Sequence, residues 1–177
     1  PMAIMIPIMP KLVEKFGKKE ICVFGLFLSS FASIFNAVFL PNVTTYFVMQ
    51  AITGFGYSFM SITNWAIVMD VIDYQEYSTG IRNESAVYAV YTFSRKLGQT
   101  IADGAGLFLL QWAKYDSLTA GNGFIAENDT SKKIMFICTI IPAIVYTSVW
   151  LIFRFGYPLT KEKMEPIYES LRKKHEA

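Results

Sequence analysis

The stretch Ile21–Leu40, ICVFGLFLSSFASIFNAVFL, runs for twenty residues without a single charged side chain. About 20 predominantly apolar residues in a helix are enough to cross the ~30 Å hydrocarbon core of a bilayer. Three further apolar segments are long enough to do the same, at about 45–69, 85–112 and 134–156. Because the connections between them are mostly short and polar, sequential helices should be antiparallel neighbours. The sequence therefore predicts an all-α membrane protein, a transmembrane helical bundle with four spans.

The composition of the chain agrees with this prediction. Hydrophobic residues make up 53% of the 177 residues and charged residues 17%, whereas soluble domains have about 45–50% and about 25%. The net charge of +2 gives no global electrostatic reason to bind nucleic acid. Neither H-E-x-x-H nor G-x-S-x-G occurs, and the one histidine, His175, lies in a charged tail. We therefore expect no enzyme, no metal site and no cofactor.

The segments between and around the spans set the expected orientation. Residues 1–10 are apolar but too few to span, so we interpret them as the last turns of a helix cut off upstream. Segments 11–20 and 70–84 are predicted loops, and 157–177 a tail with a short amphipathic helix. On the side of the membrane where these segments would lie, eleven lysines and arginines occur near the span ends; on the opposite side there are three. The positive-inside rule then puts both loops and the C-terminus in the cytoplasm, with the protein in the cell membrane.

The third span carries an unusual stripe of polar residues. At 100° per residue, one helical face of roughly 100° gathers two cations, an anion, an amide and hydroxyls. A charge at the centre of a span costs about 2.5–3.5 kcal/mol on insertion scales, so this face must meet protein, water or a solute. It comprises Ser85, Tyr88, Thr92, Arg95, Lys96, Gln99, Asp103 and Gly106, opposite an apolar back of Val87, Val90, Phe93, Leu97, Ile101 and Leu107.

Two interpretations of this stripe stay open. Salt bridges between helices could hold the bundle together, or the stripe could line a path for a hydrophilic solute. We favour the path, because joining helices needs one or two polar groups. Tyr88 and Tyr91 offer flat faces for a sugar ring, and Trp65 lies near the inner end of the second span. Small and polar residues elsewhere are predicted to pack helices together: Ser29, Ser30, Ser33, Asn36, Gly54 and Gly56.

The segment after the second span is rich in charge. Asp70 and Asp73 are three residues apart and would share a face if the helix continued. Carboxylates near a helix C-terminus are unfavourable unless cations pair with them, because this end of the helix dipole is negative. The segment could therefore be an ion-pair latch that closes one side of the path, or an ordinary solvated loop.

Two motifs make the chain recognisable. The stretch Asp70–Glu84, DVIDYQEYSTGIRNE, contains D-x-x-D-Y-x-E-Y, and Arg95–Gly98 contains R-K-L-G. Together with Pro10–Lys19, PKLVEKFGKK, they resemble the glycoside–pentoside–hexuronide:cation symporters, the melibiose-permease-like branch of the major facilitator superfamily. The resemblance runs from the end of the eighth helix of that fold to the tail after the twelfth. It implies a partial C-terminal six-helix half of a major facilitator fold.

The resemblance also implies a function. Such proteins carry a sugar or glycoside with Na⁺, H⁺ or Li⁺ by alternating access between two halves, and most sugar contacts and the cation site come from the N-terminal half. Lys96 matches a family lysine on the eleventh helix that lies near the sugar and cation sites, and Thr92 matches a position on the same helix near the sugar. Arg95 and Asp103 depart from the melibiose permease pattern, so the substrate should differ from its galactosides. The matching cytoplasmic charge network gives a candidate gate of Asp70, Asp73, Arg82 and Glu84. A non-transporting sugar sensor or scaffold, or less favourably a membrane-embedded enzyme, are the alternatives.

Overall fold

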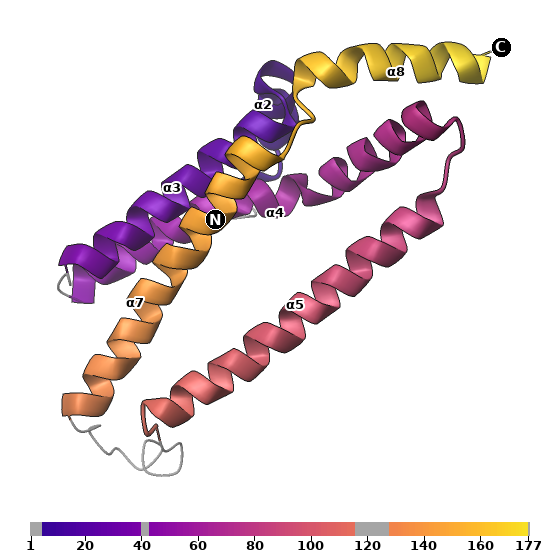
Figure 1. Cartoon of the computed structure of the whole chain (residues 1–177). Coiled ribbons are helices and arrows are strands. Elements are labelled where there is room, and N and C mark those ends of the chain that lie inside the picture. The colour runs from indigo at the N-terminus through magenta and orange to yellow at the C-terminus, as the bar shows by residue number, and fades with distance from the viewer. Residues whose placement is uncertain (1–4, 40–42, 116–127, 177) are drawn as a thin grey trace.

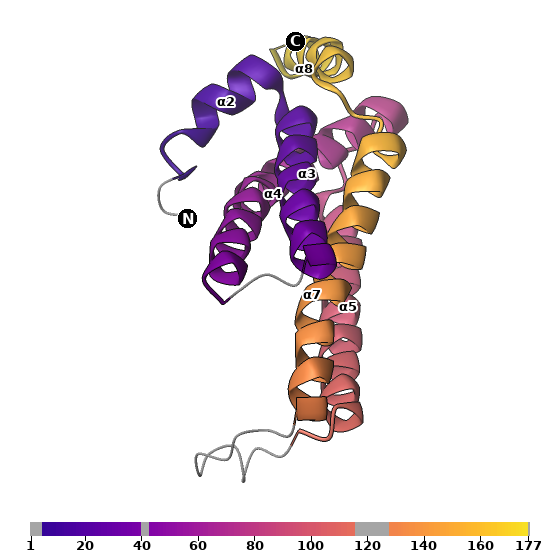
Figure 2. The ribbon, with the colours of Figure 1, turned by 90° about the vertical axis from the view of Figure 1, so that its left-hand side faces the viewer.

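The computed structural model describes residues 5–39, 43–115 and 128–176, and every regular element in these ranges is a helix (Figure 1). Two long arms extend from the end that carries the C-terminal helix, and Figure 2 shows the same arrangement from the side. In chain order the elements are α2 (Met9–Phe16), α3 (Lys18–Phe39), α4 (Val43–Thr79), α5 (Glu84–Trp112), α7 (Asn128–Leu151), the π-helical turn η1 (Ile152–Gly156) and α8 (Lys161–Glu176).

Two of the described helical segments are both long and apolar enough to cross a bilayer. They are Lys18–Phe39 and Lys133–Gly156. The predicted spans at 45–69 and 85–112 lie within α4 and α5, which have 37 and 29 residues and so have the length to cross. Their polar side chains make these two helices less apolar than Lys18–Phe39 and Lys133–Gly156. A helix that lines a polar path is expected to be less apolar than one that faces lipid.

Helix α3 is the centre of the packed part, between α4 and α7. A Cβ atom on Gly25 would lie 2.5 Å from the carbonyl oxygen of Gly56, and one on Gly56 would lie 2.5 Å from that of Gly25. Only hydrogen fits at this crossing of α3 and α4, as small residues allow in membrane bundles. Ser29 Oγ donates to the carbonyl oxygen of Thr53 at 2.9 Å. The predicted packing role is confirmed for Gly56 and Ser29, whereas nothing lies within 4 Å of a Cβ on Gly54.

Helix α5 stands apart from this core. Among the described residues it contacts α4 near their shared turn, and it has no buried residue. Figure 1 shows it separated from α3 and α4 along most of its length, with the turn from α4 at the end near α8. Its apolar back is open as well, since Phe93 and Leu107 are 68% and 71% exposed. Both faces of α5 are therefore available to lipid, water, solute or further helices.

Two predicted loops are wrong in their local structure. Segment 11–20 is helical except at Gly17, which has φ of 89° and separates α2 from α3. Segment 70–84 is helical as far as Thr79, because no helix breaker precedes Gly80, where φ is 75°. The turn is therefore short, and α5 then starts behind Asn83, whose side chain accepts from the backbone N–H of Ala86 at 3.1 Å.

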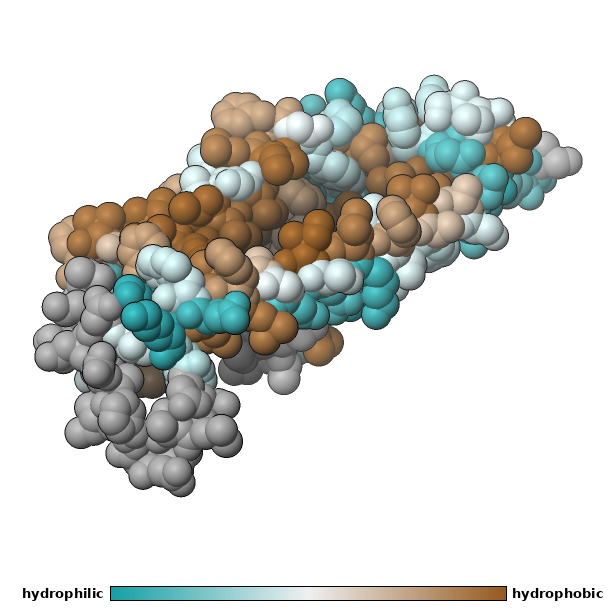
Figure 3. Space-filling model, turned by 60° about the horizontal axis from the view of Figure 1, so that its bottom comes forward, coloured by the Kyte–Doolittle hydropathy of each residue, from teal (hydrophilic) through white to brown (hydrophobic). Residues whose placement is uncertain are grey.

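The two ends of the chain fit their predictions less evenly. The expected helix over 1–10 lies partly outside the described residues, and Ile6–Ile8 form a turn before α2. The expected amphipathic tail helix is confirmed as α8. On the face shown in Figure 3, hydrophobic side chains cover most of the middle, and hydrophilic side chains gather at the end that carries α8 and again near the opposite end. We call the end that carries α8 the α8 end.

Candidate functional site

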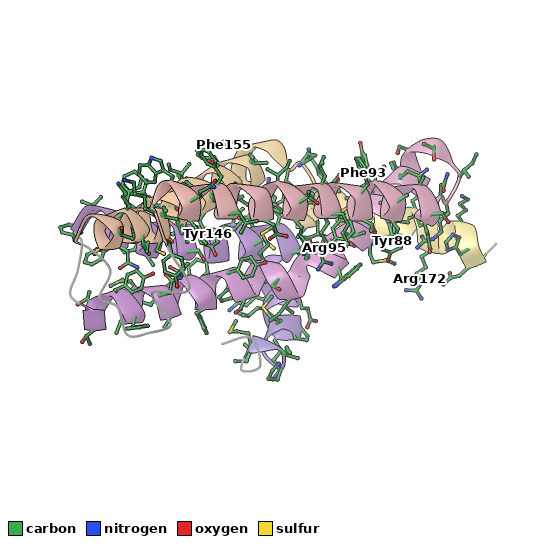
Figure 4. All side chains as sticks on the ribbon, turned by 90° about the horizontal axis from the view of Figure 1, so that it is seen from below. Tyr88, Phe93, Arg95, Tyr146, Phe155 and Arg172 are labelled. Atoms are coloured by element: carbon green, nitrogen blue, oxygen red, sulfur yellow. The ribbon has the colours of Figure 1, made fainter. Side chains whose placement is uncertain are left out.

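The polar face of α5 includes residues that contact α4. Tyr88, Tyr91 and Arg95 follow the i, i+3, i+7 spacing that places residues on one helical face. Figure 4 shows Tyr88 and Arg95 on the same side of α5, with Phe93 on the opposite side. Thr92 shares the face of Arg95, and the polar stripe predicted from periodicity is therefore present in three dimensions.

Aromatic side chains from α4 and α5 meet where the two helices come together. The ring of Trp65 lies 5.5 Å from that of Tyr91 and 6.4 Å from that of Tyr88, measured between centroids. Asn64 Nδ2 donates to the hydroxyl oxygen of Tyr91. The hydroxyl of Tyr88 donates to Met69 Sδ at 3.3 Å. We call Asn64, Trp65, Tyr88 and Tyr91 the aromatic corner; its indole remains 54% exposed.

The three charged residues of the stripe are exposed. Arg95, Lys96 and Asp103 form no ion pair or side-chain hydrogen bond with any residue in the described part of the chain. Arg95 lies eleven residues beyond Glu84, which is about 16 Å along the helix axis. Asp103 lies seven residues beyond Lys96, about 10 Å along the axis, too far for a direct ion pair. Gln99 lies between them, also exposed. The alternative in which these charges join helices finds no support among the described residues.

At the α8 end, Asp70 is the centre of a first charge cluster. Its side chain is 5% exposed, and its Oδ1 accepts hydrogen bonds from Lys18 Nζ and from the hydroxyl of Tyr168. Lys18 Nζ also donates to the hydroxyl oxygen of Tyr168 at 3.1 Å. Residues from the start of α3, the end of α4 and the middle of α8 therefore meet at one buried carboxylate. Burial, followed by the hydrogen bond to Asp70, raises the pKa of Tyr168 above its ordinary value.

Glu76 and Arg82 form the second cluster. Arg82 Nη1 lies 2.9 Å from Asp73 Oδ1 and 3.0 Å from Glu76 Oε2, and its Nε lies 2.6 Å from Glu84 Oε1. The side chain of Glu76 is 3% exposed, and its other oxygen meets α8, at 3.3 Å from Lys174 Nζ and 3.0 Å from His175 Nε2. The hydrogen bond from Arg82, followed by that from His175, lowers the pKa of Glu76 to about 2. The hydrogen bond to Glu84 is the largest of the effects that raise the pKa of Arg82.

Apolar and backbone contacts add to the docking of α8. Met164, Ile167 and Leu171 are spaced three or four residues apart and are all buried, together with Leu159. Lys161 Nζ donates to the carbonyl oxygen of Glu14 at 2.8 Å, which connects α8 to α2. A cavity of about 420 Å³ remains between these segments, and Lys18, Asp70 and Tyr168 are among the side chains that line it.

The structure brings together some of the predicted site residues and separates others. Trp65 and Tyr88 meet in the aromatic corner; Thr92, Arg95, Lys96, Gln99 and Asp103 lie along α5 without a partner from another described helix. Of the candidate gate, Asp73, Arg82 and Glu84 form one cluster, and Asp70 belongs to the other. The sequence interpretation missed Lys18, Glu76, Tyr168, Lys174 and His175.

The long helices, two of them apolar enough to cross a bilayer, are typical of a polytopic α-helical membrane protein. The chain belongs to the MFS/sugar transport protein family, whose pattern matches residues 1–161. It is therefore an integral membrane protein, and the resemblance found in its motifs is confirmed.

Three curated relatives illustrate the similarity. The chain is 31% identical over 94% of its length to an uncharacterized symporter of Bacillus subtilis, YjmB. It is 30% identical to a putative sulfoquinovose importer of Escherichia coli over 94% of the chain, and 30% identical to a glucuronide carrier protein homolog of the same organism over 91%. The chain spans about a third of the length of these relatives, 35%, 35% and 34% respectively. No solved structure matches it significantly.

Proposed function

We propose that the protein containing this chain is a secondary active transporter that carries a sugar or glycoside together with Na⁺ or H⁺. In this proposal it works by alternating access, as a member of the glycoside–pentoside–hexuronide:cation branch. The chain contributes the C-terminal part of the pathway, and a second helical half supplies most of the cation site. The relatives support the substrate class, since two are named for a sugar or its derivative, sulfoquinovose and glucuronide.

The polar face of α5 is the observation that carries the proposal. Three charges lie along the middle of a 29-residue helix with no ionic partner in the described chain. Such groups are tolerated at membrane depth where they face water, a solute or a partner of opposite charge. Next to them, the aromatic corner offers an exposed ring face, which suits the apolar face of a sugar.

The clusters at the α8 end supply the second requirement, a closure that can open. We propose that this end faces the cytoplasm, because the basic residues predicted for that side gather there around Lys18, Arg82 and α8. Two buried carboxylates, on Asp70 and Glu76, are satisfied by groups from other segments. These bonds stabilise only the states in which they are formed, namely those closed at the α8 end. Breaking them would open the path at the α8 end, and forming them again would accompany opening at the opposite end.

Gradient-driven uptake tests this proposal. The full-length protein in vesicles should accumulate a labelled glycoside when a Na⁺ or H⁺ gradient is imposed, and Lys96→Ala should abolish or strongly reduce that uptake while protein stays in the membrane. Lys173→Ala, at an exposed position of α8, serves as the matched control and should do little. If Lys96→Ala takes up the sugar as fast as wild type, the alternative in which the polar stripe of α5 joins helices is favoured. Absence of gradient-dependent accumulation with every sugar tested would contradict the proposal as a whole.

A further inference from the structure

We infer that Arg95 is the anion-recognising residue of the transport site, so that the substrate carries a carboxylate or sulfonate group on its sugar. This inference rests on the proposed function and narrows its substrate class. Its basis is the placement of Arg95 beside the aromatic corner and the charge balance of the predicted span 85–112.

Position is the first argument. Arg95 follows Tyr91 by four residues, and side chains at this spacing are neighbours on a helix, about 5–6 Å apart at Cβ. Tyr91 is held in place by Asn64 and by the ring of Trp65. A sugar ring resting on the exposed face of Trp65 would therefore present a ring substituent to Arg95. Trp65 and Arg95 would then contact two parts of one ligand: Trp65 its apolar ring face, and Arg95 its charged substituent.

Charge balance is the second argument. Within residues 85–112, the predicted span that carries the stripe, the charged side chains are two cations, Arg95 and Lys96, and one anion, Asp103. Asp103 lies more than two helical turns beyond Arg95 and does not pair with it in the described chain. Within the described residues, the region beside the aromatic corner therefore carries a net positive charge. A bound anion would remove this excess, whereas a neutral sugar would leave it.

Side-chain chemistry assigns the role to Arg95 in preference to Lys96. The planar guanidinium presents its N–H groups as a fork that matches two oxygens of a carboxylate or sulfonate. Lys96 points about 100° away from Arg95 on the helix, and so away from the aromatic corner. Its ammonium group remains available to donate hydrogen bonds to sugar hydroxyls elsewhere in the path.

A competing explanation is a carboxylate from another part of the transporter that pairs permanently with Arg95. The two explanations predict different substrate behaviour. An internal ion pair would affect acidic and neutral sugars alike, because it shapes the site before either one binds. A direct contact would affect the acidic sugar alone.

Affinity for matched sugar pairs tests the inference. In the full-length protein, equilibrium binding and gradient-driven uptake should be measured for methyl β-glucuronide against methyl β-glucoside, and for sulfoquinovose against glucose. Wild type should bind the acidic member of at least one pair at least tenfold more tightly, which is about 1.4 kcal/mol at 25 °C. Arg95→Gln should remove most of that preference by weakening the acidic sugar, and Arg95→Lys should keep part of it. Arg172→Gln, on the exposed side of α8, should leave both affinities unchanged.

The outcomes separate this inference from the proposed function. Gradient-driven uptake without any preference for acidic sugars would overturn the inference and leave the transporter assignment intact, as would equal weakening of both members of a pair by Arg95→Gln. Binding with the acidic preference but without gradient-driven accumulation would support the inference and contradict coupled transport. Should none of the four sugars bind, the inference fails. The thermal unfolding of Arg95→Lys shows whether a loss in Arg95→Gln reflects misfolding.

Discussion

Replacing Asp70 by asparagine tests whether the α8 end is held closed by its buried carboxylates. The substitution keeps the shape of the side chain and an acceptor oxygen, but removes the negative charge that Lys18 and Tyr168 share. A hydrogen bond to a charged group contributes about 1.5–3 kcal/mol. Lys18 is 26% exposed and still contacts Tyr168, so we expect the loss of about one such bond. The undocked fraction of α8 should therefore rise about 10- to 150-fold.

The rate of thiol labelling at a buried position of α8 measures that fraction. Ile167 is 6% exposed, so Ile167→Cys should react slowly with a maleimide while α8 is docked. The exposed Cys138 is replaced by alanine first, whereas Cys22 is buried. When docking is fast relative to labelling, the rate follows the undocked fraction. The experiment uses the full-length protein in proteoliposomes with the reagent on the α8 side.

Asp73→Asn is the matched control for this experiment. Asp73 shares Arg82 with Glu76 and Glu84, which remain after the substitution. The Asp73–Arg82 pair is also partly exposed, and such pairs contribute about 0.2–1 kcal/mol. We therefore expect a rise in labelling of about fivefold or less. Equal rates in the Asp70 and Asp73 variants, or a rate in Asp70→Asn that matches the parent, would refute the assignment of Asp70 as the principal buried contact.

Two further predictions concern pH and helix packing. Acidification of the α8 side should release α8. The pKa of Glu76 is lowered from an ordinary 4.5 to about 2. The stabilisation of the docked state by the Glu76 carboxylate is therefore complete above pH 4.5 and is lost as the pH falls through about 2. Labelling of the same cysteine should rise over this range and rise less in Glu76→Gln; a rate independent of pH between 5 and 2 would contradict it. Gly56→Leu should lower the stability of the bundle by about 1–3 kcal/mol or more through overpacking against Gly25, whereas Gly54→Leu meets nothing within 4 Å. Thermal unfolding in detergent measures both, and equal losses would contradict the close crossing.

The sequence was most informative where structure depends on local pattern. The uncharged run of Ile21–Leu40 predicted α3 because length and apolarity alone decide whether a helix suits a bilayer. The stripe on α5 was predicted because residues three and four apart must share a face, whatever surrounds the helix. The place where α4 ends was missed for a related reason. The charges of Asp70 and Asp73 suggested a loop, but their partners allow the helix to continue to Thr79.

The partners of those charges could not be predicted from local pattern. Asp70 meets Lys18 and Tyr168 across 52 and 98 residues of sequence, and Glu76 meets His175 across 99. Such contacts depend on how α8 packs, which periodicity within one segment does not specify. One usable signal was present in the tail, where Met164, Ile167 and Leu171 place apolar side chains on one face. That face indicates docking against other helices, and so a role for the cations beside it.

The central claim is that the polar face of α5 borders a watery path, and cysteine accessibility tests it most directly. In the full-length protein with its exposed Cys138 replaced, Gln99→Cys lies on the polar face and Ile101→Cys on the apolar back. A membrane-impermeant thiol reagent should modify the cysteine at 99 at least tenfold faster than that at 101, and bound substrate should slow the reaction at 99. Equal, slow modification at both positions, unaffected by any sugar that the protein binds, would contradict the account.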